Sequence, residues 1–452
     1  MRKCSIYVGY GRENISPRYP DGNIIPIKTA GYPQVRVCNK ILTELYASCA
    51  AFRSDDGNTI LFFSIDNIGI PAEDFDYICT RINEATGVSK DNIVLNVSHS
   101  HTAPGLGYTD TEEVRYYRNN IFFNALVKAA EGALEDLAPC TDIYVGYADG
   151  KGYTFIRRYD TDAEGNLHHE IEADSDMPIA RFVREGKKDV IFANWAAHSD
   201  TVGLTNKDNF CSVASDYIGA FRDTVESKLD AHFSMIMGAN GDVAPTSKIE
   251  GEFDFPGTDL YGEALAGKVI EALPTLKRVE PKGPIKMIST SARFEINHSL
   301  DHLAPAAEEI YSRYRADKKD PELPELCRRI GIGKISLFHG VLEAQAILSR
   351  SNAPKEEEMH MWAMRIGDIG FAIFPYEMFT KTSMDLKAAS PFGTTFVCGL
   401  SNGACIYIPA DYCFDKYDYE VFACRYYRGT AEKIQSKLSE LMDKLYSDTQ
   451  GG

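Results

Sequence analysis

The sequence predicts an α/β protein with a mixed β-sheet core flanked by helices. Short apolar runs such as 61–66 and 93–97 have the length of buried strands. Segments such as 73–85 and 430–446 instead space their apolar residues as an amphipathic helix does. Because the two kinds of segment alternate along the chain, we expect helices to cover the faces of a sheet.

The predicted elements run through the whole chain. Pro139 is expected to end the helix that precedes it, and the polar, acidic segment 160–176 is expected to form a hairpin or an excursion. Strands are predicted at 1–10, 61–66, 233–237 and 362–374, and helices at 73–85, 112–137, 214–229 and 430–446.

The chain is predicted to form one catalytic domain over residues 1–452. Its hydrophobic content of 44% is enough to bury a large core. We find no internal repeat or low-complexity linker that would divide it. The charged and proline-interrupted stretch 302–354 is predicted to be helical, which indicates an insertion or small subdomain at 300–355.

Composition excludes several classes of protein. The net charge of −17 argues against a general nucleic-acid surface, because phosphate binding needs clustered Lys and Arg. No segment is apolar for long enough to span a membrane, and the first ten residues lack the features of a secretory signal. The eleven cysteines form no CxxC pair and are predicted to be free thiols, mostly buried. We therefore expect a cytoplasmic protein.

The most informative segment is 93–105, in which an apolar strand leads into His99 and His101. Because side chains alternate between the two faces of a strand, both imidazoles point to the same side if the strand continues through them. Pro104 and Gly105 then end the strand. Two imidazoles at the carboxyl end of a strand indicate a metal-binding or proton-transfer site.

Three further apolar runs end near residues of the same chemical kind. One leads to His198, a second to Glu377 and a third toward Tyr407. Ligands of open α/β sheets gather outside the carboxyl ends of the strands, so these side chains are expected to share one crevice with His99. Such a mixed nitrogen and oxygen site is compatible with Zn²⁺, and Mn²⁺ or Fe²⁺ could also bind it.

Two other residues are candidates for the same site. Asp242 lies in a glycine-containing turn after the strand 233–237, where simple turn chemistry is the alternative explanation. Arg157 belongs to an arginine pair that could bind anionic oxygen, although such a pair in a loop is commonly a surface feature.

Taken together and in order, five blocks resemble the catalytic domain of the neutral (non-lysosomal) ceramidase family and its bacterial relatives. The resemblance covers most of the chain. It rests on Asn96–Gly105, Asn194–His198, Gly241–Pro245, Pro375–Glu377 and the segment from Leu400 to Ile408.

The resemblance implies a set of roles. His99, His198, Glu377 and Tyr407 correspond to the zinc ligands, and His101 stands beside them as a proton-transfer or substrate-binding group. Arg157 is expected to bind an anionic or oxygen-rich substrate, and Asp242 to orient a ligand. These last three residues are the candidate catalytic groups.

The chain also departs from that family. Ala244 stands where the ceramidases carry a serine, so a serine nucleophile cannot act at this position. By the same resemblance, the sequence is expected to lack the carboxyl-terminal β-sandwich that accompanies the ceramidases. These departures, with the missing secretion signal, favour a substrate other than ceramide.

We therefore expect a zinc-dependent hydrolase that uses metal-activated water on a soluble, polar small molecule, either an amide, an ester or a sugar derivative. One alternative is a metal-dependent carbohydrate lyase or isomerase, in which His101 acts as the base. A second is a catalytically inactive small-molecule-binding protein that keeps the pocket. The sequence does not indicate the oligomeric state.

Overall fold

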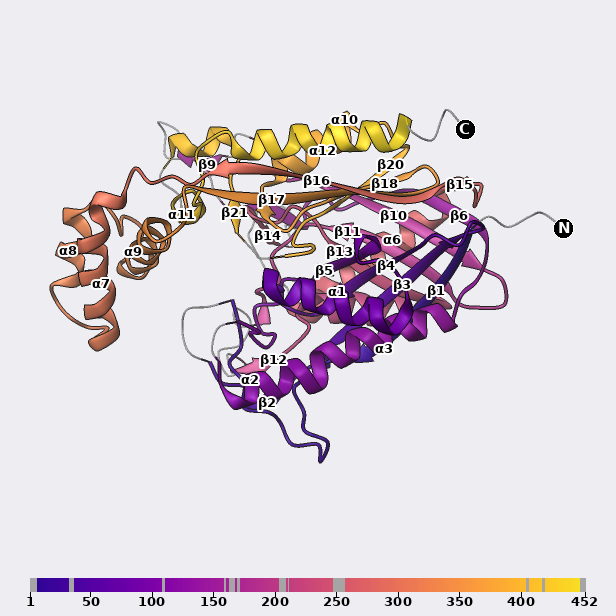
Figure 1. The fold of residues 1–452 in the computed structure, drawn as a ribbon, viewed down its shortest axis with the longest axis horizontal. Coiled ribbons are helices and arrows are strands. Elements are labelled where there is room, and N and C mark those ends of the chain that lie inside the picture. Colours follow the sequence, from indigo (N-terminus) through magenta and orange to yellow (C-terminus); the bar gives the residue numbers. More distant parts are fainter. Residues whose placement is uncertain are drawn as a thin grey trace.

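The structure is a computed structural model, and its elements are stacked in layers (Figure 1). Helices lie on the outside of two β-sheets that pack face to face. This arrangement confirms the predicted α/β class with a mixed sheet core and flanking helices. The described residues are 6–31, 36–107, 110–157, 160–161, 167–168, 171–202, 209, 211–246, 257–403, 406–416 and 419–447.

The larger sheet has nine strands in the order β13-β11-β10-β6-β1-β3-β4-β5, with β15 also paired to β6. Its neighbours are antiparallel except for β4–β5 and β11–β13, which are parallel. The sheet is therefore mixed. Its strands are β1 (Ile6–Asn14), β3 (Tyr46–Ser54), β4 (Thr59–Ile65), β5 (Ile93–Val97), β6 (Ala138–Asp149), β10 (Asp176–Arg184), β11 (Asp189–Trp195), β13 (Ala231–Met237) and β15 (Lys277–Val279).

The smaller sheet consists of β16 (Ile285–Glu295), β17 (Glu356–Ile366), β18 (Ile369–Ile373) and β20 (Thr394–Cys398). It packs on the larger sheet through a buried apolar cluster in which the rings of Phe62 and Phe371 lie 5.9 Å apart. The prediction of one strand over 362–374 is wrong, because β17 and β18 form a hairpin there. Gly367 adopts a φ of 59° at its turn, which a glycine does without strain.

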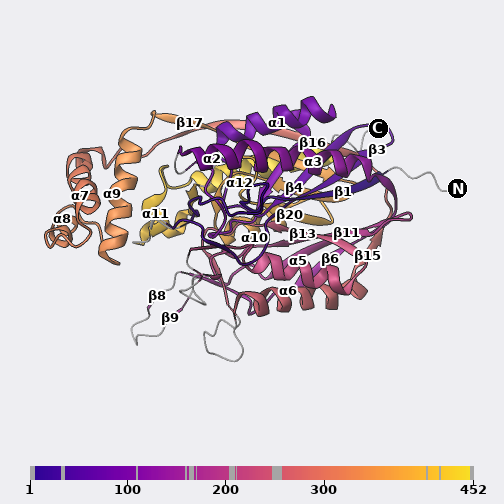
Figure 2. The same ribbon diagram turned by 90° about the horizontal axis from the view of Figure 1, so that it is seen from below.

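Four helices cover the free face of the larger sheet: α1 (Ala72–Thr86), α3 (Phe123–Glu135), α5 (Tyr217–Lys228) and α6 (Thr258–Ala272). Figure 2 shows α1 and α3 as one pair and α5 and α6 as another. On the opposite side, α10 (Thr380–Ala389) and α12 (Thr430–Ser447) cover the smaller sheet. These positions confirm the helices predicted at 73–85, 214–229 and 430–446.

The helix predicted at 112–137 is interrupted. Its ends are helical, as α2 (Glu112–Tyr116) and α3, but residues 117–122 form a π-helical turn between them. An extra residue in such a turn shifts the face that the helix presents, which sequence periodicity does not reveal.

The segment 300–355 is helical as expected, with α7 (Ala304–Ala316), α8 (Leu323–Arg329) and α9 (Leu337–Ser351). These helices share their own apolar cluster, which includes Ile310, Leu323 and Ile347. Figure 1 shows them projecting at one end of the molecule, beyond the sheets. Whether they form a separate unit stays a prediction.

Several smaller expectations can be compared directly. The first strand begins at Ile6, and residues 1–5 lie outside the described residues. Within the segment 160–176, the structure describes a short antiparallel pair, β8 (Asp160–Thr161) and β9 (Leu167–His168), and β10 begins at Asp176, the last residue of the segment.

The nine described cysteines are free, and only Cys211 among them is not buried. Within the described residues, no helix is both long enough and apolar enough to cross a membrane.

Candidate metal centre

His99 lies in a loop directly after β5. The strand ends at Val97, and His99 adopts a left-handed backbone conformation with φ 60°, which is strained for a residue other than glycine. The strand therefore does not continue through both histidines, because the chain leaves the ladder and His101 N donates to Ser199 O at 2.9 Å. The loop nevertheless brings the rings of His99 and His101 to 4.9 Å.

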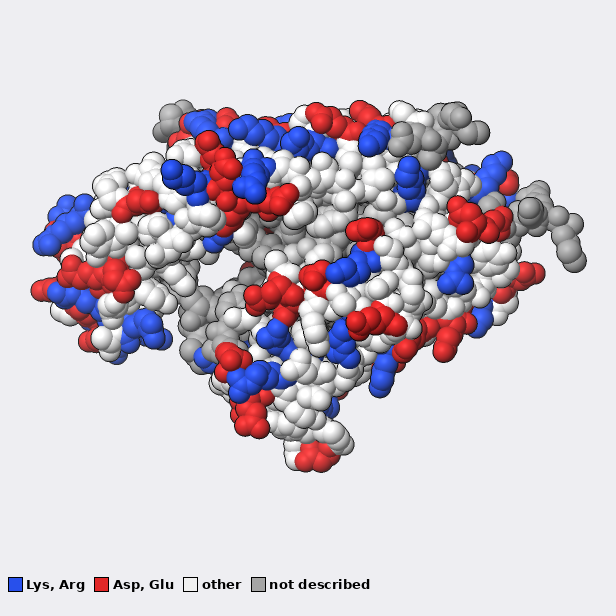
Figure 3. Space-filling view, viewed as in Figure 1, with Lys and Arg blue, Asp and Glu red and all other residues white. Residues whose placement is uncertain are grey.

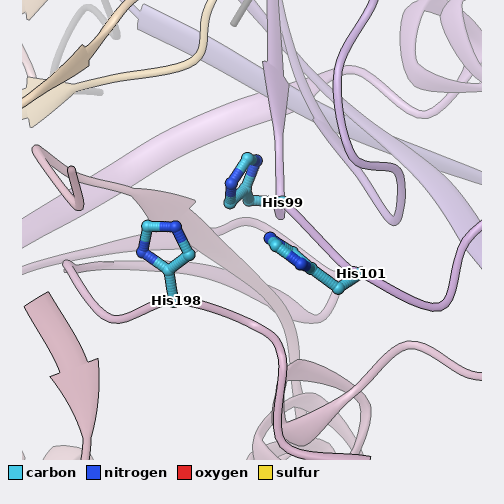
Figure 4. Close-up of side chains that lie close together, drawn as sticks. All are labelled: His99, His101 and His198. Carbon is cyan, nitrogen blue, oxygen red and sulfur yellow. The ribbon is translucent and has the colours of Figure 1, made fainter. Parts of the chain in front are cut away.

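His198 follows β11 and joins the same group (Figure 4). Its ring centroid lies 4.9 Å from that of His99 and 5.6 Å from that of His101. Candidate ligand atoms of the three histidines all lie within 4.8 Å of one another. This group could hold a metal ion.

The orientation of two of these rings is set by backbone carbonyls. His99 Nδ1 lies 2.9 Å from the carbonyl oxygen of Ile68, and His198 Nδ1 lies 2.8 Å from that of Asn240. Since a carbonyl only accepts, each Nδ1 carries the proton and donates it. Each Nε2 then keeps a lone pair, which is the arrangement of a histidine that binds a metal through Nε2.

Glu377 and Tyr407 complete the group. They lie in a two-stranded parallel ladder formed by β19 (Glu377–Met378) and β21 (Tyr407–Ile408). Glu377 Oε2 lies 3.3 Å from Nε2 of both His99 and His198. The Tyr407 hydroxyl lies 3.4 Å from His198 Nε2. The structure thus brings together all four residues that the resemblance implied as ligands.

This donor set fits a divalent cation. Glu377 is only 5% exposed, and among the described residues its Oε2 has no hydrogen-bond partner of good geometry. Two imidazole lone pairs face this oxygen, so the three acceptors repel one another unless a positive charge lies between them. Nitrogen and oxygen donors of this kind suit Zn²⁺ and its neighbours in the first transition series.

The pKa shifts in this group also agree with metal binding. Burial alone would raise the pKa of Glu377, but the adjacent His99 and His198 outweigh it and hold that pKa well below its usual range. Burial, together with the charge of Arg157, lowers the pKa of His198. Burial and the Glu377 charge raise the pKa of the Tyr407 phenol. A carboxylate beside neutral imidazoles is the protonation state that a metal requires.

His101 is held differently from the other two histidines. Gly31 packs closely against its ring, and a Cβ at position 31 would lie 2.4 Å from His101 Cγ. Burial, followed by the neighbouring His99 and His198, lowers the pKa of His101 well below its usual value. The neutral ring is therefore available to accept a proton.

Asp242 and Arg157 contact backbone groups close to the β19 strand that carries Glu377. Asp242 Oδ1 accepts a hydrogen bond of 2.7 Å from Thr380 N, the first residue of α10. Arg157 Nη2 donates to Gly241 O at 2.7 Å and to Glu420 Oε1 at 3.0 Å. Both residues reach the site region, but their expected catalytic roles stay predictions.

Sequence reasoning missed two asparagines that join the sheets beneath the site. Asn194 Nδ2 donates to Ile236 O and Val397 O, both at 3.0 Å, while its Oδ1 accepts from Val397 N at 2.9 Å. Asn96 acts in the same way, because its Nδ2 donates to Gly399 O at 2.7 Å and its Oδ1 accepts from Met237 N at 2.9 Å.

These amides bond to backbone groups of β20 and the residue after it, where this strand of the smaller sheet meets strands of the larger sheet without a ladder. They hold the ends of β5, β11, β13 and β20 together, which places the loops that carry the candidate ligands. The available signal was an asparagine within an otherwise apolar strand, three or four residues before a candidate histidine.

A cavity of about 520 Å³ opens onto the candidate ligands. His99, His101, Glu377 and Tyr407 line it, and residues of α9 form part of its wall. Figure 3 shows the surface hollowed between the projecting helices and the rest of the molecule. The apolar part of the lining comprises Ile68, Ile70, Pro71, Leu106, Ala346, Ile406 and Ala423.

Comparison with known proteins gives a clear structural match. A neutral ceramidase from Pseudomonas aeruginosa superposes with a TM-score of 0.72 and 15% identity, over 99% of this chain and 75% of that one. The chain has the fold of neutral ceramidase. A ceramidase complexed with C2 matches with a TM-score of 0.67 and 15% identity, over 99% of this chain and 76% of that one.

The five sequence blocks indicated a resemblance to the neutral ceramidases, and this match confirms that resemblance at the level of the fold. Comparison with family models and with curated proteins found no match.

Proposed function

We propose that the protein is a metal-dependent hydrolase acting on a soluble, polar amide, ester or sugar-derived small molecule. The observation that carries this proposal is the contact of Glu377 Oε2 with Nε2 of both His99 and His198, at 3.3 Å each. The ceramidase-like fold supports hydrolysis over other reactions. The cavity beside this group has the size and the mixed lining of a small-molecule site.

The proposed ligands are His99, His198, Glu377 and Tyr407, and the proposed metal is Zn²⁺, with Mn²⁺ or Fe²⁺ as possible substitutes. When bound, such an ion supplies a Lewis acid that lowers the pKa of water from 15.7 to about 7 and polarises a substrate carbonyl. The carbonyls of Ile68 and Asn240 hold the two imidazoles in place for this task.

His101 is the proposed proton carrier. A ring nitrogen of His101 accepts a proton from the attacking water and passes it to the leaving group. It lines the cavity, and its lowered pKa keeps it neutral before the reaction. No serine is required, in keeping with Ala244 at the position where ceramidases have one.

Arg157 and Asp242 have proposed supporting roles. Arg157 is already paired with Glu420, and its positive charge opposes the rise in the pKa of Tyr407. A side-chain hydrogen bond also joins Arg157 to Tyr407, so Arg157 has the proposed role of positioning the phenol, in addition to any contact with substrate. Asp242 fixes the start of α10, which follows β19 and Glu377.

Metal analysis tests the first part of the proposal. Purified protein should contain about one metal ion per chain, measured by plasma mass spectrometry. His198→Ala should lose it, whereas His302→Ala, at an exposed position outside the cavity lining, should not. Wild-type protein that retains no metal even after supplementation would contradict the proposal.

Isotope labelling tests the reaction type. With a substrate found by screening amides, esters and sugar derivatives, turnover in oxygen-18 water should place the label in one product. An unsaturated product without label would instead show elimination, the alternative in which His101 removes a proton from carbon. Tight binding without turnover of any substrate would favour a binding protein.

A further inference from the structure

Arg350 is a buried cation in the wall of the cavity that the candidate metal ligands line. It lies in the last turn of α9 and is 4% exposed. Its Nη1 donates to Cys424 O at 3.2 Å, and its Cζ lies 5.3 Å from the centroid of the Phe422 ring. Within the described residues, its Nε and Nη2 have no hydrogen-bond partner.

A second arginine in the same wall has its charge balanced. Arg425 Nη1 donates to Glu357 Oε1 at 2.7 Å, and its Nη2 donates to Ser349 Oγ at 3.1 Å. Arg350 has no such partner, because the described part of the chain places no carboxylate at ion-pair distance from it.

The charged groups around Arg350 leave the wall positive. Asp301 attracts it from a distance, but Asp301 Oδ2 already binds His298 Nδ1 at 2.9 Å. The neighbouring Arg425 repels it. A guanidinium that is buried with free donors is costly, and burial lowers the pKa of Arg350 accordingly. In a chain of net charge −17, a positive cavity wall indicates an anionic occupant.

We propose that Arg350 binds an oxyanion of the substrate, either a carboxylate or a phosphate. The planar fork of a guanidinium matches both groups, and its Nε and Nη2 supply the paired donors. Because these two atoms are enclosed, this contact requires the guanidinium to turn toward the cavity when the anion binds.

This assignment narrows the substrate class, and in that respect it rests on the proposed hydrolase function. The bond to be cleaved lies at the group formed by His99, His198 and Glu377, and the oxyanion lies at Arg350. Apolar side chains such as Ile70 and Ile406 also line the cavity. The substrate is therefore a small acid that carries an anionic group and an apolar part in addition to the hydrolysable bond.

Anion binding tests the assignment without any need for turnover. Calorimetric titration with inorganic phosphate and with acetate should show that one of them binds the metal-loaded protein. Arg350→Gln should raise its dissociation constant about 10- to 100-fold, the effect of removing a charge-assisted contact. Arg350→Lys should keep part of the affinity, which shows that the folded site is intact. Arg329→Gln, an exposed arginine on α8, should leave binding unchanged.

His198→Ala separates this inference from the proposed function. If the anion binds at Arg350, binding persists in His198→Ala, even though the metal is lost. Binding that disappears in His198→Ala and persists in Arg350→Gln shows an anion held by the metal and overturns the inference while leaving the hydrolase proposal standing. Failure of both anions to bind wild-type protein also overturns it. Arg350-dependent binding in a protein that holds no metal would keep the anion site and reject the hydrolase.

Discussion

Glu377 and Tyr407 are direct partners across the parallel β19–β21 ladder. Partners in register leave a ladder on the same face, so the carboxylate and the phenol both reach the group formed by His99 and His198. Two short strands, separated in the chain by α10 and β20, thus supply both oxygen donors of the candidate metal centre.

Removing the hydroxyl group of Tyr407 should weaken metal binding and leave the fold intact. We expect Tyr407→Phe to lower metal affinity about 10-fold, because the hydroxyl near His198 Nε2 is lost without changing the ring. Competition with a chelator of known affinity measures this. Tyr77→Phe, at a tyrosine that is 49% exposed, is the control. Equal affinities for both variants would remove Tyr407 from the ligand set.

Substitution of each histidine after β5 should give different results. His99→Ala should lose the metal, because the Nε2 that faces Glu377 is gone. His101→Ala should keep the metal but lower kcat about 100- to 10,000-fold, as expected for a lost proton carrier. Metal content and steady-state rates measure both effects. Equal metal loss in the two variants would instead show a site of three histidines.

Asn194 should be important for stability. Asn194→Ala leaves Val397 N and the carbonyls of Ile236 and Val397 without this partner. We expect the free energy of unfolding to fall by about 3 to 5 kcal/mol. Urea denaturation measures it, with the exposed Asn120→Ala expected to change it by less than about 0.5 kcal/mol. A loss below about 1 kcal/mol would contradict the bridging role.

A methyl group at Gly241 should disturb the metal centre. A Cβ there would come within 2.5 Å of Glu377 O, so the backbone of β19 must move. We expect Gly241→Ala to lower metal affinity at least about 10-fold. Gly267→Ala is the matched control, because a Cβ at that position in α6 meets nothing within 4 Å. It should raise the free energy of unfolding by up to about 1 kcal/mol and leave metal binding unchanged.

Acid should lower the stability of the folded protein, in part because Glu226 becomes protonated. Burial would raise the pKa of Glu226, but Arg12 and the backbone N–H of Phe233 outweigh burial and lower it. This contribution is fully present above the ordinary pKa of a glutamate and is lost as the pH falls through the lowered value.

Glu226→Gln should therefore cost about 1 to 2 kcal/mol at neutral pH and little in strong acid. Unfolding measured at a series of pH values checks this. The exposed Glu84→Gln should match wild type throughout. A variant that loses stability with acid as steeply as wild type would contradict the prediction.

Elements with strong periodicity could be predicted from the sequence. The helix at 430–446 and the strands before His99 and His198 lie where apolar spacing indicated them. The hairpin at Gly367 and the π-helical turn at 117–122 were missed, because both elements flanking each feature have the same apolar character. Whether the chain turns back at Gly367, or shifts its helical face at 117–122, depends on packing against other layers of the fold.

The sequence by itself determined the α/β class and the helical nature of 300–355, since these follow from local periodicity. The candidate ligands followed from residue chemistry together with the resemblance to the ceramidases. Only the tertiary structure decided how the ligands meet. The left-handed turn at His99, the pairing of Glu377 with Tyr407 and the bridging amide of Asn194 each depend on contacts between segments far apart in the chain. The same holds for Arg350, since its two unmatched donors follow from how α9 packs against residues near Cys424.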